Sequence, residues 1–221
     1  MQIDVISDTV CPWCYIGKRR LEKAMAMRPD LEFNITWRAY QLNPQMPSEG
    51  KDRDEHYQAK FGSPEKTAQI TKTIADVGRE DDLDLAFDKI ERMPNTLASH
   101  RLVRWAGSAG CQDEVVEGLF KAYFTEGRDV GDVGVLAEVA SEAGMDADLV
   151  RDLLNSDADE NLIKEEDALA RQMGVTGVPC FIFDQKFPLV GAQEPEAFLQ
   201  IFEAVMRAED ISIAEPAPTD T

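Results

Sequence analysis

The sequence predicts an α/β fold in which a β-α-β unit near the start of the chain and a β-β-α unit near its end share one mixed sheet, with a large all-helical insertion between them. Apolar and polar side chains alternate, as they do along a strand, in the first forty residues and again after residue 177. From about residue 52 to residue 170 the apolar residues recur mostly with the period of a helix. A closing amphipathic segment completes the second unit.

The first unit is predicted from three consecutive segments. Residues 2–7 alternate as a strand, a helical pattern runs from about Tyr15 to Met27, and Glu32–Tyr40 alternates again. Pro29 separates the helix from the second strand, because proline disfavours the helical conformation in the residue before it. The order is therefore strand, helix, strand.

The insertion begins after the proline-rich segment 43–47 and is divided by glycine- and proline-containing breaks. Ser63-Pro64 predicts a helix start within it, since serine is a good N-cap and proline fits the first helical position. Asn95, just before another apolar helical pattern, is a second candidate cap. We expect residues 49–170 to form an all-helical domain.

The last unit comprises two short strands, a hairpin turn and a helix. The strands are expected in Gly177–Phe183 and Phe187–Val190, and the short segment between them predicts a hairpin. The final helix is expected from about Pro195 to Arg207.

These boundaries predict a discontinuous domain made of residues 1–48 and 171–208, which the helical domain interrupts. We expect the remaining residues, 209–221, to be disordered because they contain Pro216 and Pro218 and few apolar side chains.

Charge and composition exclude several classes of function. The 221 residues include 42 acidic and 23 basic side chains, for a formal net charge of −19. Such a surface repels nucleic acid and anionic membranes, so we expect neither as a partner. No run approaches the ~18–20 apolar residues of a membrane span, and the first residues lack the features of a secretory signal. We therefore expect a cytoplasmic protein, either a monomer or a homodimer.

The Cys11-Pro12-Trp13-Cys14 segment carries the predicted chemistry. It follows a strand and begins a helix, where free backbone N–H groups and the helix dipole stabilise an anion. Thiols in such motifs have pKa values of about 3.5–7.5, compared with about 8.5 for an ordinary cysteine. Pro12 fits the first turn, and Trp13 is expected to lie partly exposed beside the sulfur. Cys11 is therefore the candidate nucleophile, and Cys14 the thiol that closes a disulfide with it.

Other uses of these cysteines fit the sequence less well. A structural zinc site needs four ligands, and the chain has no second close cysteine pair and no close histidine pair, so we predict no metal. A Cys-His hydrolase would need a histidine beside Cys11, and the chain contains only two histidines. Cys180, inside an apolar strand, is either a core residue or a third thiol near the pair. Cys111 is expected to be structural or inert.

The chain resembles the DsbA family of the thioredoxin superfamily, and within it the FrnE-like branch. The resemblance covers nearly all of the sequence except the tail. It rests on the motifs Cys11–Cys14, Trp37–Pro44, Asn95-Thr96 with His100-Arg101, Gly174–Pro179 and Gly191–Gln193.

The resemblance implies a thioredoxin fold and several substrate-binding residues. Pro179 would be cis and lie against the dithiol, and the backbone of Val178 would pair with a substrate or glutathione. Asn95 and His100 would line a cavity between the two domains. From the residues alone, Pro179 could equally be a trans proline at a strand start, and His100 a surface or capping residue. The resemblance implies glutathione as a co-substrate and no tightly bound cofactor.

The sequence is compatible with three functions. The first is a thiol–disulfide oxidoreductase that acts on a disulfide-containing protein or a small thiol or disulfide. The second is a glutathione-dependent isomerase or transferase for an aromatic small molecule, as in the related 2-hydroxychromene-2-carboxylate isomerases and kappa-class glutathione transferases. Those relatives carry serine at the position of Cys11 and lack a cysteine at that of Cys14, so this departure favours the first function. The third is a non-catalytic client-binding protein.

Overall fold

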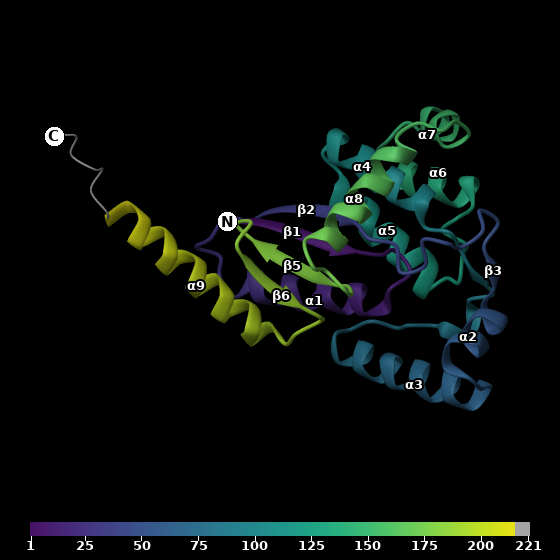
Figure 1. Cartoon of the computed structure of the whole chain (residues 1–221), viewed down its shortest axis with the longest axis horizontal. Helices are drawn as coiled ribbons and strands as arrows, with labels where there is room; N and C mark the ends of the chain where they lie inside the picture. Colours follow the sequence, from purple (N-terminus) through teal and green to yellow (C-terminus); the bar gives the residue numbers. More distant parts are fainter. Residues whose placement is uncertain (215–221) are drawn as a thin grey trace.

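The computed structural model describes the backbone of residues 1–214 and the side chains of residues 1–208 (Figure 1). Its main sheet has four strands in the order β2-β1-β5-β6. β1 pairs with β2 in parallel and with β5 antiparallel, and β5 pairs antiparallel with β6. The strands are β1 (Gln2–Ser7), β2 (Asn34–Ala39), β5 (Cys180–Phe183) and β6 (Phe187–Val190). The predicted mixed sheet of an early β-α-β and a late β-β-α unit is confirmed.

Helices α1 (Pro12–Ala26) and α9 (Pro195–Ala214) cover one face of this sheet (Figure 1). Phe181 and Phe183 point toward them: the ring centroids of Phe181 and Phe198 lie 4.9 Å apart. At Gly17, α1 lies so close to the sheet that an added Cβ would be 3.0 Å from Phe181 Cζ. Neighbouring strand residues point to opposite faces, so Cys180 lies on the other face, in a cluster with Ile6 and others.

The insertion is mainly helical, as predicted. Its helices are α2 (Arg53–Phe61), α3 (Pro64–Glu80), α4 (Leu97–Ala109), α5 (Gln112–Phe124), α6 (Val133–Glu142), α7 (Ala147–Leu154) and α8 (Glu160–Gln172), with a short 3-10 helix at Phe87–Lys89. Figure 1 shows α4 to α8 on one side of the sheet domain, and α2 and α3 as a separate pair on the other.

The sequence did not predict one feature of the insertion. Two short antiparallel strands, β3 (Lys51–Asp52) and β4 (Arg92–Met93), join the start of α2 to the segment before α4. Each strand has two residues, which is too short to produce an alternating pattern. The insertion is therefore not all-helical.

Several element boundaries also differ from the prediction. Helix α1 begins at Pro12 rather than near Tyr15, because the Cys-Pro-Trp-Cys segment itself forms its first turn. Ser63 caps α3 as predicted, accepting a hydrogen bond from the Lys66 N–H. The N-cap of α4 is Thr96. The predicted tail, 209–221, falls on residues whose side chains, and from 215 also the backbone, lie outside the described part of the chain.

Helix α1 is fixed to the insertion on two sides, which determines where the dithiol points. Toward α3, the Arg20 Nε donates to Asp81 Oδ2 at 2.6 Å, and both side chains are buried. Toward α5, the Lys18 Nζ donates to Asp113 Oδ2 at 3.0 Å. The Tyr15 ring stacks on Phe120 at a centroid distance of 5.0 Å. A continuous apolar core thus links α1 with the insertion.

Candidate active site

The two cysteines occupy the first turn of α1, directly after the loop that leaves β1. Cys11 is the N-cap residue and Pro12 is the first helical residue. The Cys11 N–H donates to Asp8 O at 3.0 Å, and the Cys11 carbonyl accepts from the Cys14 N–H at 3.0 Å. Both cysteines are free thiols. The loop and the helix start therefore hold Cys11 at the positive end of the helix dipole.

The two thiols have different environments. Cys11 is 3% exposed and lines a groove at the surface, whereas Cys14 is 1% exposed and lies behind it. Burial raises the pKa of Cys14 well above its ordinary value, and the neighbouring Cys11 and the carboxylate of Asp8 raise it further. Cys14 is therefore held protonated, while Cys11 is the thiol that borders the groove.

The loop before β5 closes over the dithiol. Its Val178–Pro179 peptide bond is cis, and the Cys11 Sγ donates to Val178 O at 3.5 Å. Pro179 packs against α1, where its Cγ would lie 3.1 Å from a Cβ added to Gly17. Val178 itself lines the groove beside Cys11, while Pro179 does not. The backbone of this loop thus lies where a substrate bound at Cys11 would pass.

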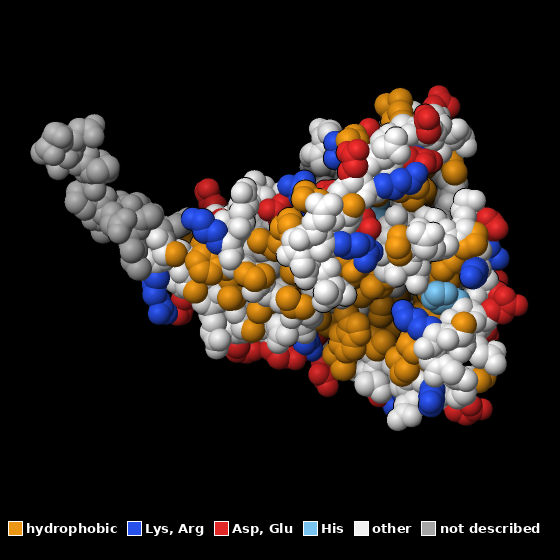
Figure 2. Space-filling view, in the orientation of Figure 1, with side chains coloured by type: hydrophobic (Ala, Val, Ile, Leu, Met, Phe, Trp, Pro, Cys, Tyr) orange, Lys and Arg blue, Asp and Glu red, His pale blue; other side chains and the backbone are white. Residues whose placement is uncertain are grey.

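The groove at Cys11 has a cavity volume of about 320 Å³. Pro12 and Trp13 form one edge, and Trp13 is 37% exposed, as expected of a partly exposed residue beside the sulfur. Figure 2 shows hydrophobic side chains gathered in the hollow between the sheet domain and the α2–α3 pair. The apolar wall is formed by Leu42, Phe61, Ile70, Ile74, Phe87 and Met93. Among the lining residues, Lys60 is the single charged side chain.

Asn95 and His100, which were predicted to line a substrate cavity, are not among the residues that line this groove. Asn95 Nδ2 donates to Met46 O at 2.6 Å, and its Oδ1 accepts from the Leu97 N–H at 2.9 Å. The buried His100 Nε2 lies 3.2 Å from Tyr40 O and 3.4 Å from Asp8 Oδ1. In this structure both side chains support loops behind the groove.

Two residues beside the dithiol were missed from the sequence. Asp8 is fully buried, and its Oδ2 accepts from the Leu42 N–H at 2.7 Å. Tyr57, on α2, lines the groove with Cys11 and is 8% exposed. Asp8 stands three positions before Cys11 at a strand end, which was a usable signal for a site residue. Tyr57 lies in a polar helical stretch and gives no such signal.

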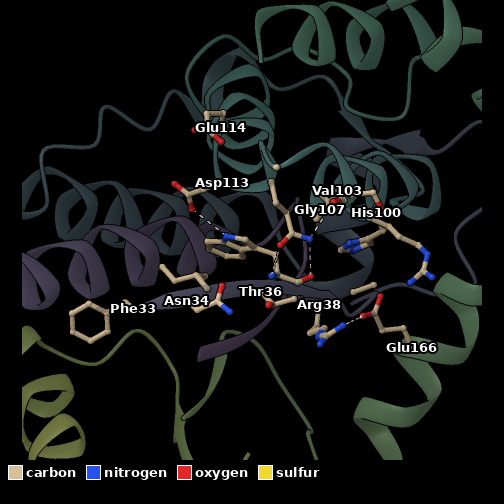
Figure 3. Close-up of a pocket in the computed structure, with 17 residues that line it drawn as sticks. Phe33, Asn34, Thr36, Arg38, His100, Val103, Gly107, Asp113, Glu114 and Glu166 are labelled. Carbon is tan, nitrogen blue, oxygen red and sulfur yellow. Dashed lines mark hydrogen bonds and ion pairs between the residues drawn. The ribbon is translucent and has the colours of Figure 1, made fainter. Parts of the chain in front are cut away.

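A larger groove of about 660 Å³ lies elsewhere, along the edge strand β2 (Figure 3). Gln112 pairs with this edge: its Oε1 accepts from the Trp37 N–H at 2.9 Å, and its Nε2 donates to Trp37 O at 3.3 Å. His100 lies at this groove, and Arg38 forms an ion pair with Glu166 at its rim. Neither Cys11 nor Cys14 lines it.

Within the described residues, no group of three or more His, Cys, Asp or Glu side chains is arranged to hold a metal ion. None of the helices in that part of the chain combines the length and apolar character needed to cross a membrane.

The fold and the site together define a dithiol protein built on a thioredoxin-like sheet. Comparison with known families agrees: the DSBA-like thioredoxin domain matches residues 2–203, and the chain belongs to that family. The uncharacterised protein YwbO of Bacillus subtilis is 25% identical over 183 residues, which are 82% of this chain and 86% of that protein.

Solved structures show the same fold. A probable DsbA oxidoreductase of Streptomyces coelicolor is 28% identical, with a TM-score of 0.84, and the match covers 100% of this chain and 93% of that one. A 2-hydroxychromene-2-carboxylate isomerase (18% identical, TM-score 0.68) matches 97% of this chain and 100% of its own. The cytosolic disulfide reductase DsbM of Pseudomonas aeruginosa is 17% identical, with a TM-score of 0.66, and the match covers 94% of this chain and 100% of that one. DsbM has also been solved with glutathione.

Proposed function

We propose that this protein is a thiol–disulfide oxidoreductase in which Cys11 attacks a substrate disulfide and Cys14 resolves the resulting mixed disulfide. The observation that carries the proposal is the unequal placement of the two thiols. Cys11 borders a groove at the helix N-terminus, and Cys14 lies one turn behind it, buried and protonated. An attacking thiol must meet the substrate, while a resolving thiol has only to reach the attacking one.

The reaction proceeds by two thiol–disulfide exchanges. The Cys11 thiolate attacks one sulfur of the substrate; a new S–S bond forms as the substrate S–S bond breaks, and the other sulfur leaves with the electron pair and takes up a proton. Cys14 then loses its proton and attacks Cys11 Sγ. The second substrate sulfur leaves as a thiol, and the Cys11–Cys14 disulfide remains. The substrate has gained two electrons, and the enzyme has lost them.

The direction in the cell depends on the surrounding thiol pool. We infer a cytoplasmic location, where glutathione is reducing, so the resting enzyme would be a dithiol that reduces or isomerises disulfides. Glutathione would then regenerate it as a co-substrate rather than a bound cofactor. Support comes from the groove, whose one charged lining residue is Lys60, suited to a carboxylate, and from the fold shared with DsbM.

The substrate-binding residues of the proposal are Pro12, Trp13 and Val178, with Pro179 behind them. The isomerase alternative needs no resolving thiol, and a client-binding protein needs neither thiol. Product formation that survives Cys14→Ser without any redox change would support the isomerase. Client binding that survives Cys11→Ser, in a protein without exchange activity, would support the binder.

The test is equilibration of the protein with glutathione buffers of graded potential, with the free thiols counted at each potential. We expect a reversible Cys11–Cys14 disulfide that is lost in both Cys11→Ser and Cys14→Ser. Cys14→Ser should instead trap a mixed disulfide at Cys11. The half-buried Cys111 offers a matched control, and Cys111→Ser should change neither result. Absence of an intramolecular disulfide at every potential would exclude the proposed function.

A further inference from the structure

Helix α2 places one tyrosine in the groove that Cys11 lines. Tyr57 lines the same cavity as Cys11 and is 8% exposed, so little more than one edge of its side chain meets solvent. Its ring lies at a centroid distance of 5.4 Å from Phe61, and the Arg53 guanidinium carbon lies 5.0 Å from the ring centroid. These contacts on α2 hold the ring in place from the side of the insertion.

Burial keeps the Tyr57 hydroxyl protonated. Burial raises the pKa of Tyr57 above its ordinary value, Arg53 lowers it, and Cys11 raises it further. At neutral pH Tyr57 is therefore a hydrogen-bond donor in the groove that Cys11 lines.

The O–H of Tyr57 is free to donate. The hydroxyls of Tyr15 and Tyr123 donate to Glu117 and to Arg92 O, whereas that of Tyr40 accepts from Arg171. Among the described residues, the Tyr57 O–H, like that of Tyr40, has no acceptor. The other hydroxyl that lines the groove, on Thr71, donates to Thr67 O at 3.0 Å. Tyr57 thus brings an uncommitted O–H donor to the apolar groove.

We propose that Tyr57 is a catalytic residue whose hydroxyl donates a hydrogen bond to the sulfur that leaves when Cys11 attacks the substrate disulfide. This inference rests on the proposed function. As the substrate S–S bond breaks, the leaving sulfur carries the electron pair into a groove whose walls are mostly apolar. The O–H of Tyr57 stabilises that developing thiolate without being ionised, and the proton that the thiolate finally takes up comes from solvent.

A donor to the leaving sulfur has a recognisable kinetic effect. Thiols of low pKa leave readily, whereas thiols of high pKa carry a more basic charge and gain more from a hydrogen bond. Removing the donor should therefore slow disulfides with basic leaving groups more than those with acidic ones. A side chain that only fills space would affect both alike.

The experiment measures the rate of mixed-disulfide formation in a Cys14→Ser background, which isolates the first exchange. Two uncharged probes are compared: bis(2-hydroxyethyl) disulfide, whose leaving thiol is basic, and 2,2′-dithiodipyridine, whose leaving group is stabilised. We expect Tyr57→Phe to slow the reaction with bis(2-hydroxyethyl) disulfide by about tenfold, because a hydrogen bond to a charged group is lost. The rate with 2,2′-dithiodipyridine should change by less than about twofold.

Tyr123→Phe is the matched control, because it removes a buried tyrosine hydroxyl that is bound to Arg92 O and does not line the groove. It should leave the ratio of the two rates unchanged. If Tyr57→Phe does not fold, 3-fluorotyrosine at position 57 serves instead, because it keeps the ring and makes the hydroxyl a stronger donor. It should raise the rate with bis(2-hydroxyethyl) disulfide relative to the rate with 2,2′-dithiodipyridine.

Equal slowing of both probes by Tyr57→Phe, or no slowing of either, would overturn the inference while leaving the proposed function standing. If the Cys14→Ser protein that retains Tyr57 forms no mixed disulfide with either probe, the proposed function fails, and the role of Tyr57 fails with it.

Discussion

At the scale of single residues, the site depends on unequal burial of two chemically identical groups. Cys14 is buried beneath Cys11, close to the fully buried carboxylate of Asp8. Each of these neighbours disfavours a negative charge on Cys14, so Cys14 keeps its proton. In the proposed mechanism, this protonated Cys14 reacts only after Cys11 has formed the mixed disulfide.

The raised pKa of Cys14 predicts how the stability of the reduced protein depends on pH. The unfolded chain releases this proton near pH 8.5, while the folded protein still holds it, so the free energy of unfolding falls as pH rises above about 8.5. Below that pH both states are protonated and the contribution is complete. Cys14 alone should add a loss of about 1.4 kcal/mol per pH unit in this range.

Urea unfolding of the reduced protein between pH 7 and pH 9.5 checks this prediction. The difference between the wild type and Cys14→Ser removes the effects of other buried groups, among them Cys180, whose pKa is also raised by burial. A Cys14→Ser protein whose stability falls as steeply as that of the wild type would contradict the prediction.

At the scale of elements, α1 has to be held rigidly if both thiols are to keep their places. The buried Arg20 guanidinium connects the middle of α1 with Asp81 at the end of α3 and with Ala192 O before α9. Lys23, one turn further along α1, donates to the same carboxylate at 3.0 Å. The α2–α3 pair, which carries Tyr57 and one wall of the groove, is thus tied to the helix that carries the dithiol.

Asp81→Asn tests this connection. The substitution leaves a buried Arg20 without its closest counter-charge, which typically costs about 3 kcal/mol in the free energy of unfolding. Asp82→Asn is the control, because Asp82 is 91% exposed and lies 3.7 Å from Lys23; it should cost less than about 0.5 kcal/mol. Urea denaturation of the two variants measures both values, and equal values would mean that Asp81 does not hold the two helices together.

At the scale of the whole molecule, the sequence predicted the parts that local pattern determines. The four strands of the main sheet have alternating or apolar runs. Cys11 and Cys14 are three positions apart, so a single helical turn brings the two thiols together. The groove could not be predicted in the same way. Tyr57 and Cys11 line one groove although they belong to different helices. Asn95 and His100 do not line it, and their polar atoms bind backbone carbonyls of loops. These placements depend on tertiary packing.

The charge distribution of the whole molecule makes a last prediction. The net charge is −19, yet no Asp or Glu is among the residues that line the Cys11 groove. Repulsion of an anionic disulfide therefore comes mainly from distant surface carboxylates, and salt screens such long-range effects: the Debye length falls from about 30 Å at 0.01 M to about 8 Å at 0.15 M. The rate at which Cys11 reacts with glutathione disulfide should rise over this range.

Stopped-flow rates for the Cys14→Ser protein at graded salt concentrations measure the effect, with bis(2-hydroxyethyl) disulfide as the uncharged reference. The reference rate should stay constant, because no net charge is brought to the groove. A glutathione disulfide rate that falls with salt would instead mean that attraction by Lys60, the one charged residue lining the groove, outweighs the remaining surface. In that case the rate of the Lys60→Gln protein with glutathione disulfide should rise with salt, which would show that Lys60 alone determines the sign of the salt effect.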